Sequence, residues 1–485
     1  MSREEALSAL KQRLATVNDL AGAYSVLSWD QQTYMPEQSV ADRAEQMTTL
    51  SKLAHELAVD PEVGRLLDAL DGQFEPGSDE EALVRVARRN YLKETKLPTE
   101  LVAELTRTTA LAESAWARAR AESDWAMFAP HLEKMVDLQR QVARQLNPDI
   151  HPFDALLDWG EPGMSKAQIE TMYEELKAGT VPLIRAIAER SAGETRDAAL
   201  HGDYPEPLQE RFGETIISRF GYDWNRGRQD RTVHPFCTSF GIDDVRITTR
   251  FDPAWLSPAL FGTLHESGHA LYEQGVSKAY ARTPLAGGAS MGVHESQSRL
   301  WENLVGRSRP FWSHFYPKLQ ETFPERLGGV ALEDFYKAIN TVQPSFIRVE
   351  ADELTYNMHT LLRFELELEL LDGTLSVADL PAAWNAKMEA YLGITPPDDA
   401  QGALQDVHWS SGLFAYFPTY TIGNVLSVQL FEEAVKAHPE IPAEMERGEF
   451  GALLGWLREN IHQYGSKYEP NELVTRATGR PMDTA

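Results

Sequence analysis

One segment of the chain decides the fold around it: residues 257–275, SPALFGTLHESGHALYEQG. Ser257 and Pro258 predict the start of a helix, because a serine oxygen can accept hydrogen bonds from free amides and proline needs no amide bond in the first turn. Gly275 predicts the end of the helix. Most of the remaining chain has apolar side chains at three- and four-residue spacing, which predicts a mainly α-helical protein.

The middle of this helix carries the pattern HESGH at residues 265–269. At about 100° per residue, His265, Glu266 and His269 share one flank of the helix. A separate arc is apolar and consists of Leu260, Phe261, Leu264 and Leu271. Two imidazoles one turn apart can bind one zinc ion, and the glutamate between them can accept a proton from the attacking water. The alternative is two surface histidines on an amphipathic helix; we interpret the pattern as a zinc site.

A zinc hydrolase needs a third protein ligand and an open position for water. Glu273 lies on the same helix, but one straight helix cannot easily wrap three positions around one ion. A second predicted helix, residues 290–306, carries Glu295 and Glu302 two turns apart on one face. The spacing leaves both open as the ligand, and Glu295 could instead pair with Arg299, four positions later.

A short strand is expected just before the zinc helix. Residues 245–251 alternate apolar and polar side chains and are rich in β-branched residues, which predicts a strand. Residues 232–236 are its predicted partner, joined through a turn at residues 241–244. Arg246 and Thr248 share a face of this strand, and we assign them structural support of the site. A small sheet therefore interrupts an otherwise helical chain.

Composition narrows the possible functions. The 485 residues include 46 Lys and Arg against 73 Asp and Glu, a formal net charge of −27. This charge disfavours binding to nucleic acids and anionic membrane surfaces. The single cysteine, Cys237, cannot form an internal disulfide or a cysteine-cluster metal site and is expected to be a small buried hydrophobe. No membrane span or signal peptide is expected, which places the protein in the cytoplasm.

Several further motifs accompany the zinc pattern. They are residues 29–36 (WDQQTYMP), 244–248 (DVRIT), 294–297 (HESQ), 347–352 (IRVEAD) and 402–409 (GALQDVHW). With these motifs in this order, the chain resembles the thermostable, Taq-type metallocarboxypeptidases of the M32 family over nearly its whole length.

The resemblance implies a gluzincin fold: a two-lobed helical body with a deep active-site groove, similar to angiotensin-converting enzyme and thimet oligopeptidase. It implies one peptidase domain over residues 1–485, with N-terminal helices (residues 1–80) roofing the groove. It also implies Glu295 as the third ligand, a zinc ion that cobalt can replace, and a homodimer.

Arg348 is the predicted anchor for the terminal carboxylate of a peptide. A carboxypeptidase must distinguish that carboxylate from an internal amide, and a guanidinium group matches it well. The resemblance assigns this role to the arginine of the IRVEAD motif. The residues alone favour a different interpretation, a salt bridge on a helix surface with Asp352, four positions later.

The aromatic-rich residues 408–420 supply further candidates, although core packing is their default role. Peptide hydrolysis creates an oxyanion that a positioned donor stabilises, and the related groove-shaped peptidases supply a tyrosine and a histidine from a similar late segment. We predict that Tyr420 contacts the oxyanion or carboxylate, with Tyr416 as the alternative. His408 is a predicted substrate contact, and His234 is predicted to line the primed side of the groove.

Together these features predict a zinc carboxypeptidase of broad specificity that releases single C-terminal residues from peptides. One alternative is a zinc oligopeptidase or dipeptidyl carboxypeptidase with the same fold, which product length would distinguish. A second is a non-catalytic, acidic helical binding protein. Glu266 speaks against it, because a purely structural metal site has no need of a proton acceptor at that position.

Overall fold

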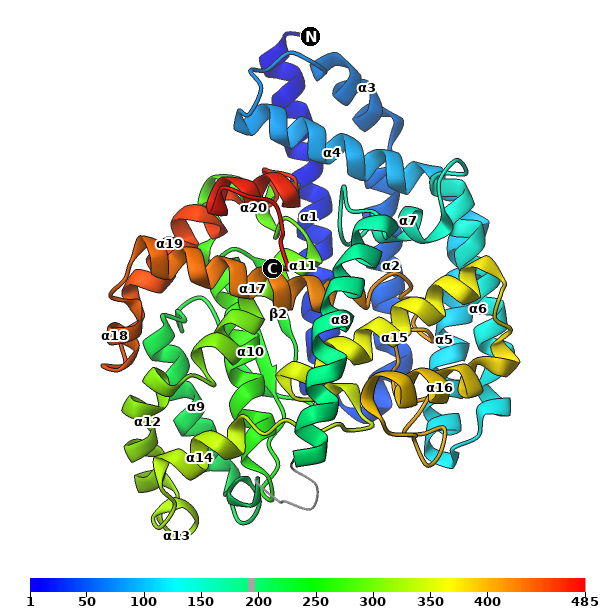
Figure 1. The fold of residues 1–485 in the computed structure, drawn as a ribbon. Helices are drawn as coiled ribbons and strands as arrows, with labels where there is room; N and C mark the ends of the chain where they lie inside the picture. Colours follow the sequence, from blue (N-terminus) through cyan, green and yellow to red (C-terminus); the bar gives the residue numbers. More distant parts are fainter. Residues whose placement is uncertain (191–196, 485) are drawn as a thin grey trace. The chain divides into compact units, whose positions relative to one another are not determined.

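The computed structural model describes residues 1–190 and 197–484 (Figure 1). Contacts within the chain divide it into two compact units. The first unit comprises Met1–Thr95, Arg196–Ile339 and Gly423–Asp483; the second comprises Lys96–Thr195, Asn340–Ile422 and Thr484–Ala485. Helices dominate both units and a small sheet lies in the first, which confirms the prediction of a mainly α-helical fold. The single peptidase domain, the groove and the covering role of residues 1–80 stay predictions.

The first unit is a helical assembly with its own buried clusters. Its α-helices are α1 (Arg3–Thr33), α2 (Val40–Ala58), α3 (Pro61–Leu70), α4 (Asp79–Lys96), α9 (Glu206–Phe220), α10 (Leu256–Gly275), α11 (Met291–Arg299), α12 (Arg309–Thr322), α13 (Pro324–Leu327), α14 (Leu332–Ile339), α17 (Pro418–Ala437), α18 (Ile441–Met445), α19 (Gly451–Asn460) and α20 (Pro470–Thr478). The first residues of α17, up to Ile422, are part of the second unit. Its 3₁₀ turns are η1 (Glu37–Ser39), η2 (Ala198–Leu200), η3 (Lys278–Tyr280), η4 (Pro284–Ala286) and η8 (His462–Tyr464). Leu10 of α1 packs with Leu67 of α3 and Val84 of α4, because each helix presents an apolar stripe.

The predicted strand lies in the centre of the sheet, but it ends at Thr249, two residues earlier than predicted. The strand order is β1 (Gln229–Arg231), β3 (Asp244–Thr249) and β2 (Cys237–Gly241), with β1 parallel and β2 antiparallel to β3. The turn between β2 and β3 is the one predicted. The predicted partner, residues 232–236, is wrong, because this segment connects β1 to β2. Pro235 has no amide hydrogen for a ladder. Next to it, the Thr248 amide donates to the Phe236 carbonyl at 2.9 Å, and the Thr248 hydroxyl accepts a hydrogen bond from the Phe236 amide at 2.8 Å.

Helix α10 carries the HESGH pattern and ends at Gly275, as predicted. Its start differs from the prediction, because Trp255 is the N-cap residue and makes no side-chain cap. The Trp255 amide donates to the Asp252 carbonyl at 3.2 Å in a turn that begins the helix earlier. The prediction of Ser257 as the cap is therefore wrong. Within the first unit, α10 packs against α9, α11 and β3.

The second predicted ligand helix, residues 290–306, is regular only in its first part. Ser290 caps α11 by accepting a hydrogen bond from the Val293 amide at 3.1 Å. After Arg299 the chain continues as a π-helix, η5 (Leu300–Val305). A π-helix has a wider turn than an α-helix, and such turns are frequent at functional sites. Glu295 and Glu302 therefore lie on two different kinds of helical turn.

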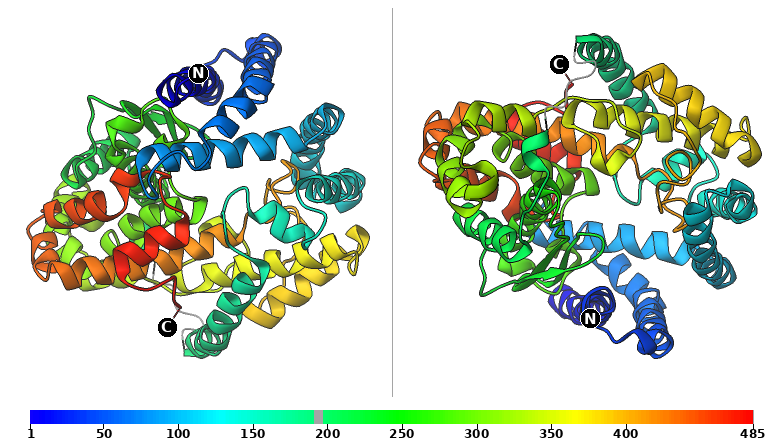
Figure 2. Two further views of the ribbon diagram at one scale, coloured as in Figure 1. Left: turned by 90° about the horizontal axis from the view of Figure 1, so that it is seen from above. Right: turned by 90° about the horizontal axis from the view of Figure 1, so that it is seen from below.

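The second unit is also helical. Its helices are α5 (Thr99–Glu122), α6 (Trp125–Leu146), α7 (Pro152–Leu157), α8 (Lys166–Arg190), α15 (Glu353–Asp372) and α16 (Leu380–Leu392), with 3₁₀ turns η6 (Arg348–Glu350) and η7 (Val377–Asp379). Helices α5 and α6 lie side by side, in cyan in Figure 2. Helix α15 packs against α8 and α16 and contributes Phe364, whose ring lies 5.2 Å from those of Phe153 and Tyr173.

Over residues 1–190 and 197–484, no helix has both the length and the apolar character needed to cross a membrane.

Candidate functional site

Three predicted ligands come together in the first unit. The Glu295 Oε2 atom on α11 lies 3.7 Å from His265 Nε2 and 3.4 Å from His269 Nε2, both on α10. Ligand atoms on a tetrahedron with zinc bonds of about 2.0–2.1 Å are about 3.3–3.4 Å apart, so this spacing fits a zinc ion. Two imidazole nitrogens and one carboxylate oxygen are also a donor set of catalytic zinc. The group could therefore hold a metal ion.

Two glycines allow the backbones to approach closely enough to place Glu295 there. A Cβ atom added to Gly268 would lie 2.5 Å from the Gln297 carbonyl oxygen and 2.6 Å from Ser298 Cα, both on α11. A Cβ atom added to Gly423 of α17 would lie 2.7 Å from Glu295 Cβ. Real side chains do not tolerate such distances. Helix α11 is thus held between α10 and α17 at two points where no side chain intervenes.

Arg299 orients the Glu295 carboxylate. Its Nε donates to Glu295 Oε1 at 2.7 Å, one turn along the helix, which leaves Oε2 for the histidines. Burial raises the pKa of Glu295, but the charges of Arg299 and His265 outweigh burial and hold this pKa well below its usual value. The carboxylate is therefore ionised, as a metal ligand must be.

Glu302 contacts His265 at the ring nitrogen that does not face Glu295. Its Oε2 lies 2.8 Å from His265 Nδ1, the ring nitrogen opposite the one that faces Glu295. Burial lowers the pKa of His265, but Glu295 and Glu302 outweigh burial and raise it to about 9. A carboxylate on the outer ring nitrogen fixes the orientation and tautomer of a metal-binding histidine. Sequence spacing alone did not decide whether Glu295 or Glu302 is the third metal ligand. In the structure, Glu295 faces the Nε2 atoms of the two histidines, and Glu302 faces Nδ1 of His265.

Glu266 has the electrostatics of a proton-transfer group. Its side chain is buried, and burial raises its pKa to about 7, although the nearby charge of His265 lowers it. A carboxyl group that titrates near neutrality can both accept and return a proton at physiological pH. Burial also lowers the pKa of His269, to about 3, so that this imidazole is neutral.

His294 belongs to the HESQ motif, but the sequence predicted no role for it. Its Nδ1 lies 2.6 Å from His269 Nδ1, and its Nε2 lies 2.8 Å from Glu273 Oε1. Glu273 is therefore an outer neighbour of the site and not one of the grouped ligands. The position of His294 next to Glu295 was the available signal, but a sequence does not indicate which imidazoles meet.

The remaining predicted residue of the first unit, His234, is exposed in the loop between β1 and β2. Its Nδ1 lies 3.0 Å from the Pro235 carbonyl oxygen. The nearby Arg246 forms a bidentate ion pair with Asp244, at 2.8 and 2.9 Å, and lies over the Trp29 ring at 4.4 Å. The predicted structural role of this strand thus has a physical basis, because Arg246 joins the sheet to α1.

Arg348 belongs to the second unit, and its ion-pair partner is Asp406 rather than Asp352, the partner in the alternative interpretation. Asp352 is the N-cap of α15 and accepts hydrogen bonds from the Leu354 and Thr355 amides, so the two residues do not share a helix. The interpretation of Arg348 and Asp352 as a helix-surface pair is wrong, because a capping aspartate ends the possible helix there. Arg348 instead donates from Nε and Nη2 to Asp406 Oδ1, at 3.1 and 2.9 Å.

The other candidates of the second unit surround this ion pair. The Tyr420 ring centroid lies 4.8 Å from the Arg348 guanidinium carbon. His408 Nε2 lies 3.1 Å from the Tyr420 hydroxyl, and the Tyr416 ring lies 5.4 Å from the His408 ring. Burial lowers the pKa of Arg348, but Asp406 outweighs burial and raises it well above its usual value. The structure therefore brings these four predicted residues together.

Arg363 also binds Asp406, donating from Nε to Oδ2 at 2.6 Å. Spacing along the sequence does not predict either ion pair, because Asp406 lies 43 residues from Arg363 and 58 from Arg348. Asp406 holds two buried guanidinium groups side by side. A buried pair of this kind fixes side-chain geometry more surely than it stabilises the fold.

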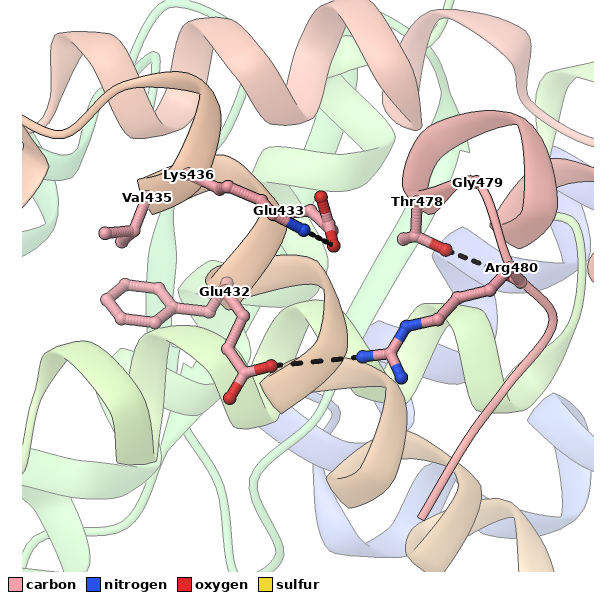
Figure 3. Close-up of a pocket in the computed structure, with 8 residues that line it drawn as sticks. Glu432, Glu433, Val435, Lys436, Thr478, Gly479 and Arg480 are labelled. Atoms are coloured by element: carbon pink, nitrogen blue, oxygen red, sulfur yellow. Dashed lines mark hydrogen bonds and ion pairs between the residues drawn. The ribbon is translucent and has the colours of Figure 1, made fainter. Parts of the chain in front are cut away.

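A hollow elsewhere in the first unit has different chemistry (Figure 3). It is lined by Phe431, Glu432, Glu433, Val435, Lys436, Thr478, Gly479 and Arg480, from α17 and the end of α20. Lys436 pairs with Glu433 at 2.9 Å and Arg480 with Glu432 at 4.0 Å, as the dashed lines show. The charges thus satisfy one another, and the lining holds none of the predicted site residues.

Comparisons with known proteins support the interpretation of this chain as a peptidase. The family model described as Carboxypeptidase Taq (M32) metallopeptidase matches residues 9–485. Thermostable carboxypeptidase 1 of Thermus thermophilus is 44% identical over 473 residues, 95% of this chain and 92% of that protein. Carboxypeptidase 1 of Bacillus subtilis is 38% identical over 472 residues, 97% and 94% of the two chains. The crystal structure of the M32 carboxypeptidase from Deinococcus radiodurans has a TM-score of 0.95 at 45% identity, with 99% and 96% coverage.

Proposed function

This chain belongs to the M32 family of Taq-type metallocarboxypeptidases, and on that premise we propose that it is a zinc enzyme in which His265, His269 and Glu295 hold the ion. The observation that carries the proposal is the convergence of their three donor atoms within 4.8 Å of one another. When bound, zinc supplies Lewis acidity that polarises the scissile carbonyl and acidifies water.

Glu266 is the proposed general base. Its carboxyl group is buried beside the ligands and has a pKa of about 7, so it can accept a proton from the attacking water and deliver it to the leaving amine. Glu266→Gln keeps the shape of the side chain and removes its basicity. The expected result is a fall of about 10²- to 10⁴-fold in kcat with zinc affinity unchanged. Full activity of the zinc-loaded variant would contradict this role.

Arg348 is the proposed anchor of the terminal carboxylate. A guanidinium has five N–H donors. Three hydrogen bonds engage Nε, Nη1 and Nη2, to Asp406 and to the Tyr356 hydroxyl, so each terminal nitrogen keeps a further hydrogen for a carboxylate. Asp406 fixes the direction of the guanidinium. The anchor explains why the last peptide bond, rather than an internal one, would be cleaved.

Tyr420 is the proposed donor to the oxyanion or to the substrate carboxylate, with Tyr416 as the alternative. The contact between the Tyr420 hydroxyl and His408 supports this role, because a phenol fixed by a hydrogen bond is already oriented for a developing charge. His408 is proposed to contact the substrate through the same hydrogen bond network. His234, which is exposed, is proposed to contact residues on the primed side.

One experiment tests the reaction. An N-terminally blocked peptide with a free C-terminus is compared with its C-terminal amide, after chelation and after zinc is restored, with products identified by mass spectrometry. Stepwise loss of single residues from the free acid alone, dependent on zinc, is expected. Equal cleavage of the amide would contradict the carboxylate anchor, and cleavage that survives complete chelation would contradict the metal centre.

Two further proposals follow from the family resemblance. Cobalt is proposed to restore activity in place of zinc, because it accepts the same nitrogen and oxygen donors. A homodimer is proposed as the oligomeric state. Metal reconstitution and analytical ultracentrifugation test these two proposals separately.

A further inference from the structure

The two metal-site histidines differ in what holds their outer ring nitrogens. His265 Nδ1 faces a carboxylate directly, at 2.8 Å from Glu302. His269 Nδ1 faces a second imidazole, at 2.6 Å from His294 Nδ1. From this contact we propose that His294 is a positioning residue that fixes the tautomer and ring orientation of His269. The inference rests on the proposed metal-binding role of His269.

The hydrogen bonds allow one arrangement of protons. Two ring nitrogens 2.6 Å apart must share a single proton, because two N–H groups would repel and two lone pairs would not bond. A metal ligand needs its lone pair on the coordinating nitrogen, so His269 Nε2 is unprotonated and His269 Nδ1 is the donor. His294 Nδ1 must then accept this hydrogen bond.

Glu273 completes the same arrangement. With its lone pair on Nδ1, His294 carries its proton on Nε2, which lies 2.8 Å from Glu273 Oε1. The Glu273 carboxylate accepts a hydrogen bond from His294 Nε2–H, which disfavours the tautomer of His294 that carries its proton on Nδ1. The chain therefore runs from Glu273 through His294 to His269, and each group determines the tautomer of the next.

Packing holds His294 in this orientation. Its ring lies 5.2 Å from the ring of Tyr272, whose opposite neighbour is the fully buried His462 at 5.1 Å. The Tyr272 hydroxyl accepts a hydrogen bond from the Ala289 amide at 3.1 Å. A Cβ added to Gly288 would lie only 3.0 Å from both His294 Cδ2 and Tyr272 Cε1, so the backbone there also packs closely against both rings. These contacts on part of the ring limit its freedom to rotate away from His269.

The test compares an acceptor with an apolar side chain at position 294. The zinc dissociation constant is measured by competition with a chromophoric chelator at one fixed pH, and the melting temperature of each metal-free variant is recorded. His294→Leu is expected to weaken zinc binding about 10- to 100-fold. His294→Gln is expected to lose less, because its amide oxygen can accept the His269 Nδ1 hydrogen.

His462→Leu is the matched control. It also removes an imidazole packed against the Tyr272 ring. His462 hydrogen-bonds to Gln297, and no such bond joins it to His269 in the part of the chain that the structure describes, so the zinc affinity of this variant should equal that of the parent. A melting temperature lowered in His462→Leu with unchanged zinc affinity would show that packing loss alone does not affect the metal.

Glu273 provides a second, independent measurement. Because it acts through His294, Glu273→Leu combined with His294→Leu should bind zinc no more weakly than His294→Leu alone. Additive losses would overturn the proposed chain of contacts. Equal losses in His294→Leu and His294→Gln would overturn the acceptor role, as would parental affinity in His294→Leu. Failure of the parent itself to bind zinc would instead refute the proposed function.

Discussion

The close approach of α10 and α11 at Gly268 leads to a sharp prediction. In Gly268→Ala the new methyl group would meet backbone atoms, at 2.5 Å from the Gln297 carbonyl oxygen and 2.6 Å from Ser298 Cα. Carbon atoms normally lie about 3.5–4.0 Å apart, so the two helices must separate by about 1 Å. Backbone atoms cannot rotate away as a flexible side chain would. The shift therefore moves Glu295, which lies on the same helix, relative to the histidines.

The expected effect on metal binding is large for so small a substitution. Zinc–ligand distances vary by only about 0.2 Å between sites. A displacement of about 1 Å is several times that tolerance and should weaken zinc binding at least as much as removal of an outer contact, about 10- to 100-fold. Stability changes less, because overpacking costs about 1–3 kcal/mol and alanine regains about 1 kcal/mol of helix propensity.

Gly262→Ala on the same helix is the matched control. Its Cβ would lie 3.8 Å from the Thr249 hydroxyl oxygen, an ordinary contact. The control should gain about 1 kcal/mol of stability from helix propensity and keep its zinc affinity. Chelator competition and thermal unfolding of the metal-free proteins measure both quantities. If Gly268→Ala binds zinc as tightly as Gly262→Ala, the reasoning that backbone contact positions Glu295 is refuted.

Three further predictions concern single side chains. Arg299→Met leaves the carboxylates of Glu295 and Glu302 buried without their shared cation, so the metal-free protein should lose about 3–5 kcal/mol of stability. Bound zinc should reduce this loss, which urea unfolding measures. Equal losses with and without zinc would contradict the argument. Burial raises the pKa of Glu367 from 4.5 to about 8, despite hydrogen bonds from Trp409 and Ala415. The folded state therefore holds this proton more tightly than the unfolded state, and the stabilisation is full below pH 4.5 and lost as the pH rises through about 8. Glu367→Gln should flatten that decline in urea titrations between these pH values, and an unchanged slope would count against it. Tyr420→Phe should lower kcat about 10²- to 10³-fold with little change in KM if the hydroxyl meets the oxyanion; a change in KM alone would assign it to the carboxylate.

The sequence predicted best what depends on local spacing. The helix that ends at Gly275, the shared flank of His265 and His269, and the turn between β2 and β3 all follow from neighbours a few residues apart. The partner strand did not follow, because pairing depends on residues that meet only in the folded chain. Pro235 nevertheless argued against a strand at residues 232–236, because proline has no amide hydrogen to donate to a ladder.

The alternative interpretation of Arg348, a helix-surface pair with Asp352, rests on a local rule that failed for a local reason. Spacing of four residues suggests a helix pair, but it does so only if both residues lie inside the helix. Asp352 precedes Leu354 and Thr355 and caps the helix instead, a preference that is also readable from sequence. The true partner, Asp406, lies 58 residues away and could not be predicted from spacing.

The hydrogen bonds to the outer ring nitrogens of the metal-site histidines cannot be predicted from the HESGH motif. The HESGH spacing explains why two Nε2 atoms can converge on one ion, since it fixes the relation of His265 to His269 along one helix. It contains no information about their Nδ1 atoms, which face Glu302 on a π-helical turn and His294 on α11. Those contacts decide the tautomer, and the tautomer decides whether each lone pair faces the metal. An active centre and an inactive one could thus share the motif, and measurements on the outer contacts distinguish them.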